Sequence, residues 1–422
     1  MRHCIGTLAA ILLVLVWHGP AAQAGPPRVL FSDNPVALRK TPEKLKAGQP
    51  VKVVCLGDSV TCNYYHTGGR RAYAEMLGLA LKTAYPRAEV TAVNAGISGN
   101  TTIDGLKRLQ KDVLDHKPDL VTVMFGLNDM TRVPMADFRV NLGQIIERCR
   151  AVGAEVILCT PNGVIDTPGR PIPRLVEYCG AIKEVARKYQ VPVCDVYAAY
   201  ESLRARDPLS WRLLLSDEIH PNMDGHKLNA EAICRSITGH EVSLKSAAPP
   251  QPALPKTLSL LQAGQPLRVL AMAPYDKLIG PALKTVVPSA KVEVKSWPTA
   301  GQTLARIEEA ARRVRSAPPD LVIVAVPAAA TPSAQAPPEE AIRSHSWVLN
   351  WSLSFGLQEW DVVAIAPSVL KSGLTPEEKA SDEFSRRMIL AQDLNLIARP
   401  ANDPSPPERI LENWFRTQLS GK

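Results

Sequence analysis

The sequence lacks the features that mark disordered chains, membrane transporters and nucleic-acid-binding proteins. Its 422 residues are 45% hydrophobic and 21% charged, too apolar for a disordered chain, and it has no series of long uncharged runs for repeated membrane crossing. Lys and Arg number 49 against 41 Asp and Glu, a formal charge of +8, but they form no basic cluster. The composition predicts a globular protein of two or three domains that binds no nucleic acid, and it argues only weakly for an anionic partner.

Cysteine is absent after residue 240, and no two cysteines have the CxxC spacing of zinc and redox sites. Without the first 24 residues the chain keeps seven cysteines, an odd number, so at least one is expected to remain a thiol. Cys55, Cys159 and Cys194 lie in runs rich in Val and Ile, where cysteine behaves as a small buried hydrophobe. The sequence leaves any disulfide pairing open.

Residues 1–24 have the pattern of a secretory signal. Arg2 precedes the apolar run IGTLAAILLVLVW, and Ala22-Gln23-Ala24 is a small-x-small cleavage site. The alternative is an uncleaved membrane anchor, but the run is shorter than the ~20 residues of a spanning helix. We therefore expect a secreted or periplasmic protein with a lead segment over 25–48 and no integral membrane segment after cleavage.

Residues 49–240 alternate short β-branched runs with segments of helical spacing. Continuous apolar strands separated by helices predict a doubly wound α/β domain, whose parallel sheet is covered on both faces. In such sheets ligands bind beyond the carboxyl ends of the strands. The expected strands are VKVVCLG (51–57), EVTAVN (89–94), DLVTVMF (119–125), AEVILCT (154–160) and VPVCDV (191–196).

A Pro- and Ala-rich linker over 241–262 separates this domain from an internal repeat over 263–422. Three blocks recur in the same order, which is hard to attribute to chance. We therefore expect a second α/β domain of the same type, with later strands over 360–367 and 393–399 and a closing helix near PPERILENWF. The repeated blocks are KAGQPVKVVCLG with QAGQPLRVLAMA, LKTAYPRAEVTAV with LKTVVPSAKVEVK, and KPDLVTVMF with PPDLVIVAV.

Polar residues follow three of the first domain's predicted strands. Ser59 lies in Gly57-Asp58-Ser59 after the first strand, the segment 94–101 (NAGISGNT) follows the second, and Asn128 lies in Gly126-Leu127-Asn128-Asp129 after the third. Each motif alone is consistent with a tight turn or a helix cap. Three strand ends that meet at one edge of a sheet favour a shared site.

A histidine near the end of the first domain can activate a hydroxyl. Asp217 and His220 are three residues apart, so the carboxylate can orient the imidazole toward a serine, which is a weak nucleophile without a base. The alternative is a metal site made by Asp217, His220, Asp224 and His226, but no distant second cluster supplies further ligands. His226 is expected in the first turn of the last helix, capped by Asp224.

These blocks, GDSV, NAGISG, GLND and DEIHPN, together resemble the SGNH or GDSL-type esterase and lipase family over residues 51–235. The resemblance implies a flavodoxin-like fold of five strands in which Ser59 is the nucleophile, His220 the general base and Asp217 its orienting carboxylate. The oxyanion hole would be the N–H groups of Ser59 and Gly99, preferred over Gly96, with the side-chain amide of Asn128. No metal and no cofactor are implied, and the G-x-S-x-G pentapeptide of α/β-hydrolases is absent.

The second domain has lost these groups. The repeat places Ala273-Pro274-Tyr275 at the Gly-Asp-Ser positions and Ala329 at the position of Asn128, whereas Gly301 still matches Gly99. No Asp-x-x-His occurs after residue 262, so a degenerate domain without catalytic residues is expected. It holds five tryptophans, which either fill a core poor in Phe, the interpretation we favour, or stack on sugar rings: Trp297, Trp347, Trp351, Trp360 and Trp414.

The sequence thus predicts a secreted serine ester hydrolase that removes acyl groups, most simply acetyl, from a carbohydrate. The alternatives are a lipase or lysophospholipase of the same family, or a non-catalytic glycan-binding protein. Tyr64, Tyr65 and His66, which follow the serine loop, either line the substrate pocket or only pack over the first helix. The oligomeric state is left open.

Overall fold

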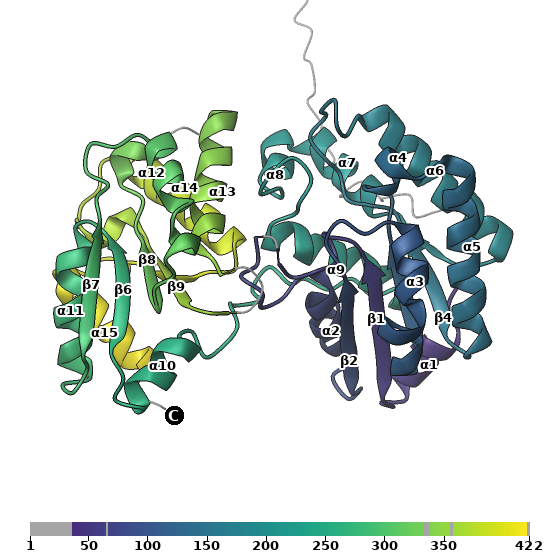
Figure 1. The fold of residues 1–422 in the computed structure, drawn as a ribbon, viewed down its shortest axis with the longest axis horizontal. Helices are drawn as coiled ribbons and strands as arrows, with labels where there is room; N and C mark the ends of the chain where they lie inside the picture. The colour runs from purple at the N-terminus through teal and green to yellow at the C-terminus, as the bar shows by residue number, and fades with distance from the viewer. Residues whose placement is uncertain (1–35, 65, 333–336, 355–357, 420–422) are drawn as a thin grey trace, which may run out of the picture. The chain divides into compact units, whose positions relative to one another are not determined.

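The computed structural model describes residues 36–64, 66–332, 337–354 and 358–419, all within one compact unit of the chain. They form two five-stranded parallel sheets, each flanked by helices (Figure 1). The predicted α/β fold class is therefore confirmed. The predicted signal over 1–24 lies outside the described residues, as does Tyr65.

The first sheet has the strand order β2-β1-β3-β4-β5, with every neighbouring pair parallel. All five side chains of β3 are buried, as expected for a strand covered on both faces. The observed strands lie within two residues of the predicted ones. Their bounds are β1 (Val51–Gly57), β2 (Val90–Gly96), β3 (Leu120–Met124), β4 (Glu155–Cys159) and β5 (Val193–Cys194).

The helices of the first sheet pack in two groups. Helix α2 packs against α9, whereas α5 packs against both α3 and α6 (Figure 1). The bounds are α1 (Lys40–Lys46), α2 (Tyr73–Ala84), α3 (Thr102–Asp112), α4 (Asp129–Arg132), α5 (Met135–Ala151), α6 (Ile172–Tyr189), α7 (Val196–Arg206), α8 (Pro208–Arg212) and α9 (Met223–Thr238).

The second sheet has the order β10-β9-β8-β6-β7, which is the order of the first sheet with each strand replaced by its predicted counterpart. The expected closing helix is present as α15. The strands are β6 (Leu267–Met272), β7 (Val292–Trp297), β8 (Leu321–Val324), β9 (Asp361–Ile365) and β10 (Asn395–Ile397). The helices are α10 (Pro255–Gln262), α11 (Tyr275–Val286), α12 (Leu304–Ala311), α13 (Glu339–Ser352), α14 (Pro376–Ala391) and α15 (Pro407–Leu419).

The last third of the predicted linker is a helix, α10, and not an extended connection. Pro255 takes the first turn of this helix, where its missing N–H costs nothing. The side chain of Asp361, at the start of β9, accepts the N–H of Thr257 at 2.7 Å. In the first sheet Glu155, at the start of β4, accepts the N–H of Thr41 in α1 at the same distance. Each sheet is thus preceded by a short helix that a strand carboxylate caps.

All seven cysteines from Cys55 to Cys234 are buried, and no disulfide joins them. Burial raises the pKa of the Cys55 thiol to about 12, despite a hydrogen bond with Thr122 that lowers it. The interpretation of Cys55, Cys159 and Cys194 as small core residues is confirmed. Among the described residues no helix is long and apolar enough to cross a membrane.

Candidate active site

Ser59 follows β1 in a tight turn at the carboxyl edge of the first sheet. The carbonyl of Asp58 accepts the N–H of Cys62 at 3.0 Å, which closes the turn. Gly57 is required here, because a Cβ would lie 2.0 Å from Thr61 Oγ1 and 2.7 Å from the carbonyl oxygen of Met124. The close approach of β1 to this turn therefore decides where the Ser59 hydroxyl lies.

Ser59, His220 and Asp217, which are 161 and three residues apart, form one chain of hydrogen bonds. His220 Nε2 lies 2.9 Å from Ser59 Oγ, and His220 Nδ1 lies 2.7 Å from Asp217 Oδ2. A carboxylate can only accept, so Nδ1 carries the proton and Nε2 is free to accept the serine hydroxyl proton. The arrangement is that of a nucleophile, a base and an orienting carboxylate.

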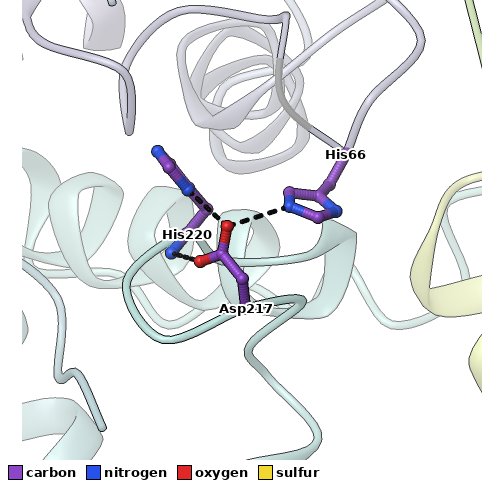
Figure 2. Close-up of side chains that lie close together, drawn as sticks. All are labelled: His66, Asp217 and His220. Carbon is purple, nitrogen blue, oxygen red and sulfur yellow. Dashed lines mark hydrogen bonds and ion pairs between the residues drawn. The ribbon is translucent and has the colours of Figure 1, made fainter. Parts of the chain in front are cut away.

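Asp217 is fixed by more than its bond to His220. Its Oδ1 accepts the backbone N–H groups of Ile219 at 2.8 Å and of His220 at 2.7 Å. Its Oδ2 also lies 3.2 Å from Nε2 of His66, a residue on the loop after Ser59 (Figure 2). Burial alone would raise the pKa of Asp217, but its electrostatic interaction with His220 and the hydrogen bonds from both histidines hold it well below its usual value. The carboxylate is therefore ionised.

The two glycines considered for the oxyanion hole differ in their surroundings. A Cβ on Gly96 would lie 2.2 Å from the backbone N of Cys62, so this glycine allows β2 to pack against the serine loop. Gly99 has a φ of +76°, and no described residue places an atom within 4 Å of where its Cβ would lie, so these residues leave space beside its backbone. This difference favours Gly99 as the residue whose N–H faces a ligand.

The amide of Asn128 reaches the same loop. Its Nδ2 donates to the carbonyl of Asn100 at 3.0 Å and lies 3.5 Å from Asp58 Oδ2. Arg170, on the loop after β4, donates from Nη2 to Asn128 Oδ1 at 3.2 Å. Because the guanidinium must pair with the amide oxygen, it directs the amide nitrogen toward Asn100 and the segment that holds Gly99.

Arg108, which the sequence analysis missed, joins the loops of this edge. This α3 residue donates to the carbonyls of Gly57 at 2.9 Å and Ala95 at 2.7 Å, and to Asn100 Oδ1 at 2.7 Å. An arginine seven residues into a helix carries no local signal of this role, because these three acceptors lie outside α3, in β1, in β2 and in the loop before the helix. The same holds for Arg170, whose partner Asn128 is 42 residues away.

Asp129 also holds two loops together. Its buried Oδ1 accepts both the N–H of Thr102, at 2.8 Å, and the Thr102 hydroxyl, at 2.6 Å. Burial raises the pKa of Asp129, although these hydrogen bonds lower it. The bonds fasten the turn that holds Asn128 to the first residue of α3, so the two predicted oxyanion segments are joined directly.

The considered metal cluster of Asp217, His220, Asp224 and His226 does not form. The ligand atoms that come within 4.8 Å of one another belong to Asp217, His220 and His66 instead. The helix cap was also assigned wrongly: Asn222, not Asp224, caps α9 by accepting the N–H of Gly225 at 3.1 Å. His226 does lie in the first turn, where Nδ1 accepts the N–H of Tyr73 at 3.2 Å, and burial lowers its pKa to about 3.

The residues after the serine loop differ in their exposure to solvent. Tyr64 is exposed, whereas His66 is completely buried, so the two side chains have different surroundings. The five tryptophans of the second domain are buried to different degrees. Trp297 and Trp360 are buried in the second core, and Trp347, Trp351 and Trp414 are partly buried. Core filling therefore describes Trp297 and Trp360, and Trp351 and Trp414 pack against the same core, whereas Trp347 meets the ring of His66.

The carboxyl edge of the second sheet holds an apolar pocket of about 380 Å³ in place of a polar site. His345, the only histidine after residue 262, is buried in α13, and burial lowers its pKa to about 4. Lys371 and Glu378 form an ion pair at 2.8 Å and also line the pocket. Much of the remaining lining comes from Ala273, Pro274, Tyr275, Thr299, Ala325, Val326 and Ala328.

Comparison with known proteins gives matches over the first domain. The model of the GDSL-like lipase/acylhydrolase family matches residues 55–228. An acetylxylan esterase of Geobacillus stearothermophilus is 30% identical over 217 residues, 46% of this chain and 96% of that protein. The thioesterase 1/protease 1/lysophospholipase L1 of Escherichia coli is 28% identical over 44% of this chain and 82% of that protein. A solved lipase/acylhydrolase from Enterococcus faecalis is 34% identical with a TM-score of 0.40, and covers 46% of this chain and 97% of that one.

Proposed function

We propose that this chain, which belongs to the GDSL-like lipase/acylhydrolase family, removes short acyl groups from a carbohydrate through an acyl-enzyme on Ser59. The proposal builds on the family membership, because the chain is a carboxylic ester hydrolase. The observation that carries the proposal is the chain of hydrogen bonds from Ser59 Oγ through His220 to Asp217, at 2.9 and 2.7 Å. Each distance lies in the range that proton transfer between neighbouring groups requires.

In the first half-reaction Ser59 Oγ attacks the ester carbonyl while His220 Nε2 takes the hydroxyl proton. Asp217 stabilises the imidazolium that forms. The imidazolium then protonates the leaving sugar oxygen, which leaves an acyl group on Ser59. In the second half-reaction His220 takes a proton from water, the resulting hydroxide attacks the acyl-enzyme, and the acid leaves as Ser59 recovers its proton.

The negative oxygen of each tetrahedral intermediate would bind to three donors: the backbone N–H groups of Ser59 and Gly99 and the Nδ2 of Asn128. Nδ2 has one short contact, to Asn100, and one long one of 3.5 Å, to Asp58, so its second proton is available to a ligand. Arg170 pairs with the oxygen of the same amide and prevents it from turning. Preorganised donors of this kind are usually the largest single contribution to acyl transfer.

A sugar acetate is the substrate that the comparisons favour. A relative at 30% identity, almost all of whose length is matched, carries the name acetylxylan esterase. The apolar run and cleavage pattern of residues 1–24 support export, which would bring the enzyme to extracellular polysaccharide. The proposed organisation is a signal over 1–24, a lead segment over 25–48, a catalytic domain over 49–240 and a connection over 241–262. Residues 263–422 would then be a degenerate domain without catalytic residues, since their sheet repeats the strand order of the first.

The test combines covalent labelling with a substrate series. A fluorophosphonate probe should label the wild-type chain and not Ser59→Ala, and Ser59→Ala should lose at least about 10³-fold in kcat while staying folded. Ser98→Ala, a second serine of the same edge, serves as the control and should keep its activity. Acetylated xylan and p-nitrophenyl esters of increasing chain length should show a preference for acetyl groups.

Each outcome decides one part of the proposal. An active Ser59→Ala would contradict the nucleophile, and a preference for long acyl chains would favour the lysophospholipase alternative. Binding of glycan without labelling by the probe would indicate a non-catalytic protein. Activity that a chelator abolishes and a divalent ion restores would indicate a metal at the cluster of His66, Asp217 and His220.

A further inference from the structure

His66 is a buried histidine that no step of the proposed mechanism uses. Its side chain is completely buried, and its Nε2 lies 3.2 Å from Asp217 Oδ2. Figure 2 shows His66 and His220 on opposite sides of this carboxylate, each with a ring nitrogen directed at the same oxygen. Asp217 is therefore held from both sides, by the proposed base and by a second imidazole from the loop after Ser59.

The groups that hold His66 come from the second domain. The backbone N–H of His66 donates to Oδ1 of Asn350 at 3.1 Å, and its ring meets the ring of Trp347 edge-on with centroids 5.2 Å apart. Both partners lie on α13, outside residues 55–228 that match the family model. His66 has a φ of +57°, a strained value for a residue with a Cβ, so it needs such contacts to persist.

The chemistry of this contact gives His66 one role, that of a neutral donor. Burial lowers the pKa of His66, although the hydrogen bond and charge of Asp217 oppose the shift, and no described residue hydrogen-bonds to its Nδ1. The tautomer that fits carries its proton on Nε2 and donates it to the carboxylate. A neutral donor restrains Asp217 Oδ2 without adding a positive charge beside His220.

We propose that His66 is a positioning residue of ester hydrolysis, which holds the Asp217 carboxylate in line with His220 while Asn350 and Trp347 of α13 hold His66. The second domain thereby supports the site although it has lost catalytic residues of its own. This inference rests on the proposed roles of Ser59, His220 and Asp217. Misplacing a catalytic group by about 1 Å can lower the rate about 10²-fold, so a second restraint on Asp217 has a measurable effect.

A matched pair of amide variants in the full-length chain tests the contact. Asn and Gln carry the same donor group, and Asn adopts positive φ readily, but only Gln is long enough to reach Asp217 from position 66. We expect His66→Asn to lower kcat for p-nitrophenyl acetate by about 10-fold or more, with KM within about twofold, because an orienting group acts on chemistry and not on binding. His66→Gln should stay within about threefold of wild type, and His116→Asn, at an exposed histidine, should be unchanged.

A double-mutant cycle tests the link to α13. Asn350→Leu should lower kcat by about three- to tenfold in the wild-type background and have no further effect in His66→Asn, because it acts through His66. If Asn350→Leu does not fold, the amide pair at position 66 decides alone. Circular dichroism and the urea midpoint confirm that each variant compared is folded.

The outcomes separate this inference from the proposed function. A folded His66→Asn with wild-type kcat, an equal loss in His66→Gln, or additive effects of the two sites would overturn the positioning role. In each of these cases an inactive Ser59→Ala would leave the proposed function intact. An active Ser59→Ala would instead refute the proposed function, and with it the reason for positioning Asp217.

Discussion

The two sheets of this protein agree at their amino ends and differ at their carboxyl ends. At the amino ends, Asp119 accepts the N–H of Lys52 at 2.8 Å, and Asp320 accepts the N–H of Arg268 at 2.9 Å. These bonds join the first strand of each sheet to its neighbour, β3 or β8. Strand order and the bonds between strands define the fold, and both are the same in the two sheets.

The carboxyl ends carry different side chains on this common frame. The first sheet presents Ser59, Asn128 and a hydrogen-bonded His220, whereas the second presents an apolar pocket lined by Ala273 and Tyr275. Residues at this edge can change without loss of the core, because the sheet packs through the middle of its strands. The comparison teaches that fold and chemistry are specified by opposite edges of the same sheet.

The largest expected effect comes from making the first edge resemble the second at one position. Asn128→Ala copies Ala329, the residue that the repeat places there, and removes one of the three proposed oxyanion donors. We expect kcat to fall by about 10²- to 10³-fold, since one such donor contributes about 3–4 kcal/mol to the stability of the transition state. Steady-state kinetics on p-nitrophenyl acetate measure it, with circular dichroism and the urea midpoint as the controls for folding. A loss below threefold would show that Asn128 is not a donor.

A smaller effect is expected on the pH dependence of stability when Asp58 is changed. The repeat places Pro274 at this position in the second sheet. Burial raises the pKa of Asp58 from 3.8 to about 6, against a hydrogen bond from the N–H of Val60 that lowers it. Between these values the folded state holds a proton that the unfolded state has lost, so Asp58 makes the protein less stable as pH rises from about 4 to about 6. Asp58→Asn should therefore raise the unfolding free energy at pH 8 by about 3 kcal/mol and leave it unchanged at pH 3.

Urea unfolding at both pH values measures this difference. Asp217→Asn is the matched control of opposite sign, because the pKa of Asp217 lies well below its usual value. Its contribution to stability is present above about pH 4 and is lost as pH falls. This control should thus be less stable than wild type at pH 8. Equal effects of the two substitutions at pH 8 would contradict the assignment of their pKa shifts.

The smallest expected effect is a loss of stability, and it tests whether the amino ends of the two sheets are structurally equivalent. Glu155→Ala and Asp361→Ala each remove the carboxylate that caps the short helix before a sheet, α1 or α10. Each should lower the unfolding free energy by about 1 kcal/mol, the usual loss on replacing a helix cap by alanine. Urea unfolding followed by circular dichroism measures the loss, with Glu89→Ala, at an exposed position, as the control. A large effect at one cap and none at the other would break the structural equivalence.

Local patterns were sufficient to predict the strands and the family motifs, but not helix α10 within the predicted linker. The apolar runs that predict β1 and β3 are continuous because parallel strands are buried on both faces, and the turn residues around Ser59 and Asn128 follow them directly. The helix cap of α9 was predicted wrongly because two nearby side chains can each accept the N–H groups of a first helical turn. Asn222 and Asp224 are both good helix caps, and only the backbone path shows which one precedes the first turn.

The sequence was enough to predict the α/β class, the five strands of the first domain and the family to which that domain belongs, because periodicity and short motifs are local properties. The order of the strands in each sheet came from the tertiary structure. The tertiary structure alone decided that Ser59 and His220, which are 161 residues apart, lie within hydrogen-bond distance, and that Arg108 and Arg170 hold the surrounding loops. It also decided that His66 meets Asp217 and Asn350, 151 and 284 residues away. Such contacts depend on how the loops beyond the strands pack, and no spacing within one segment encodes that packing.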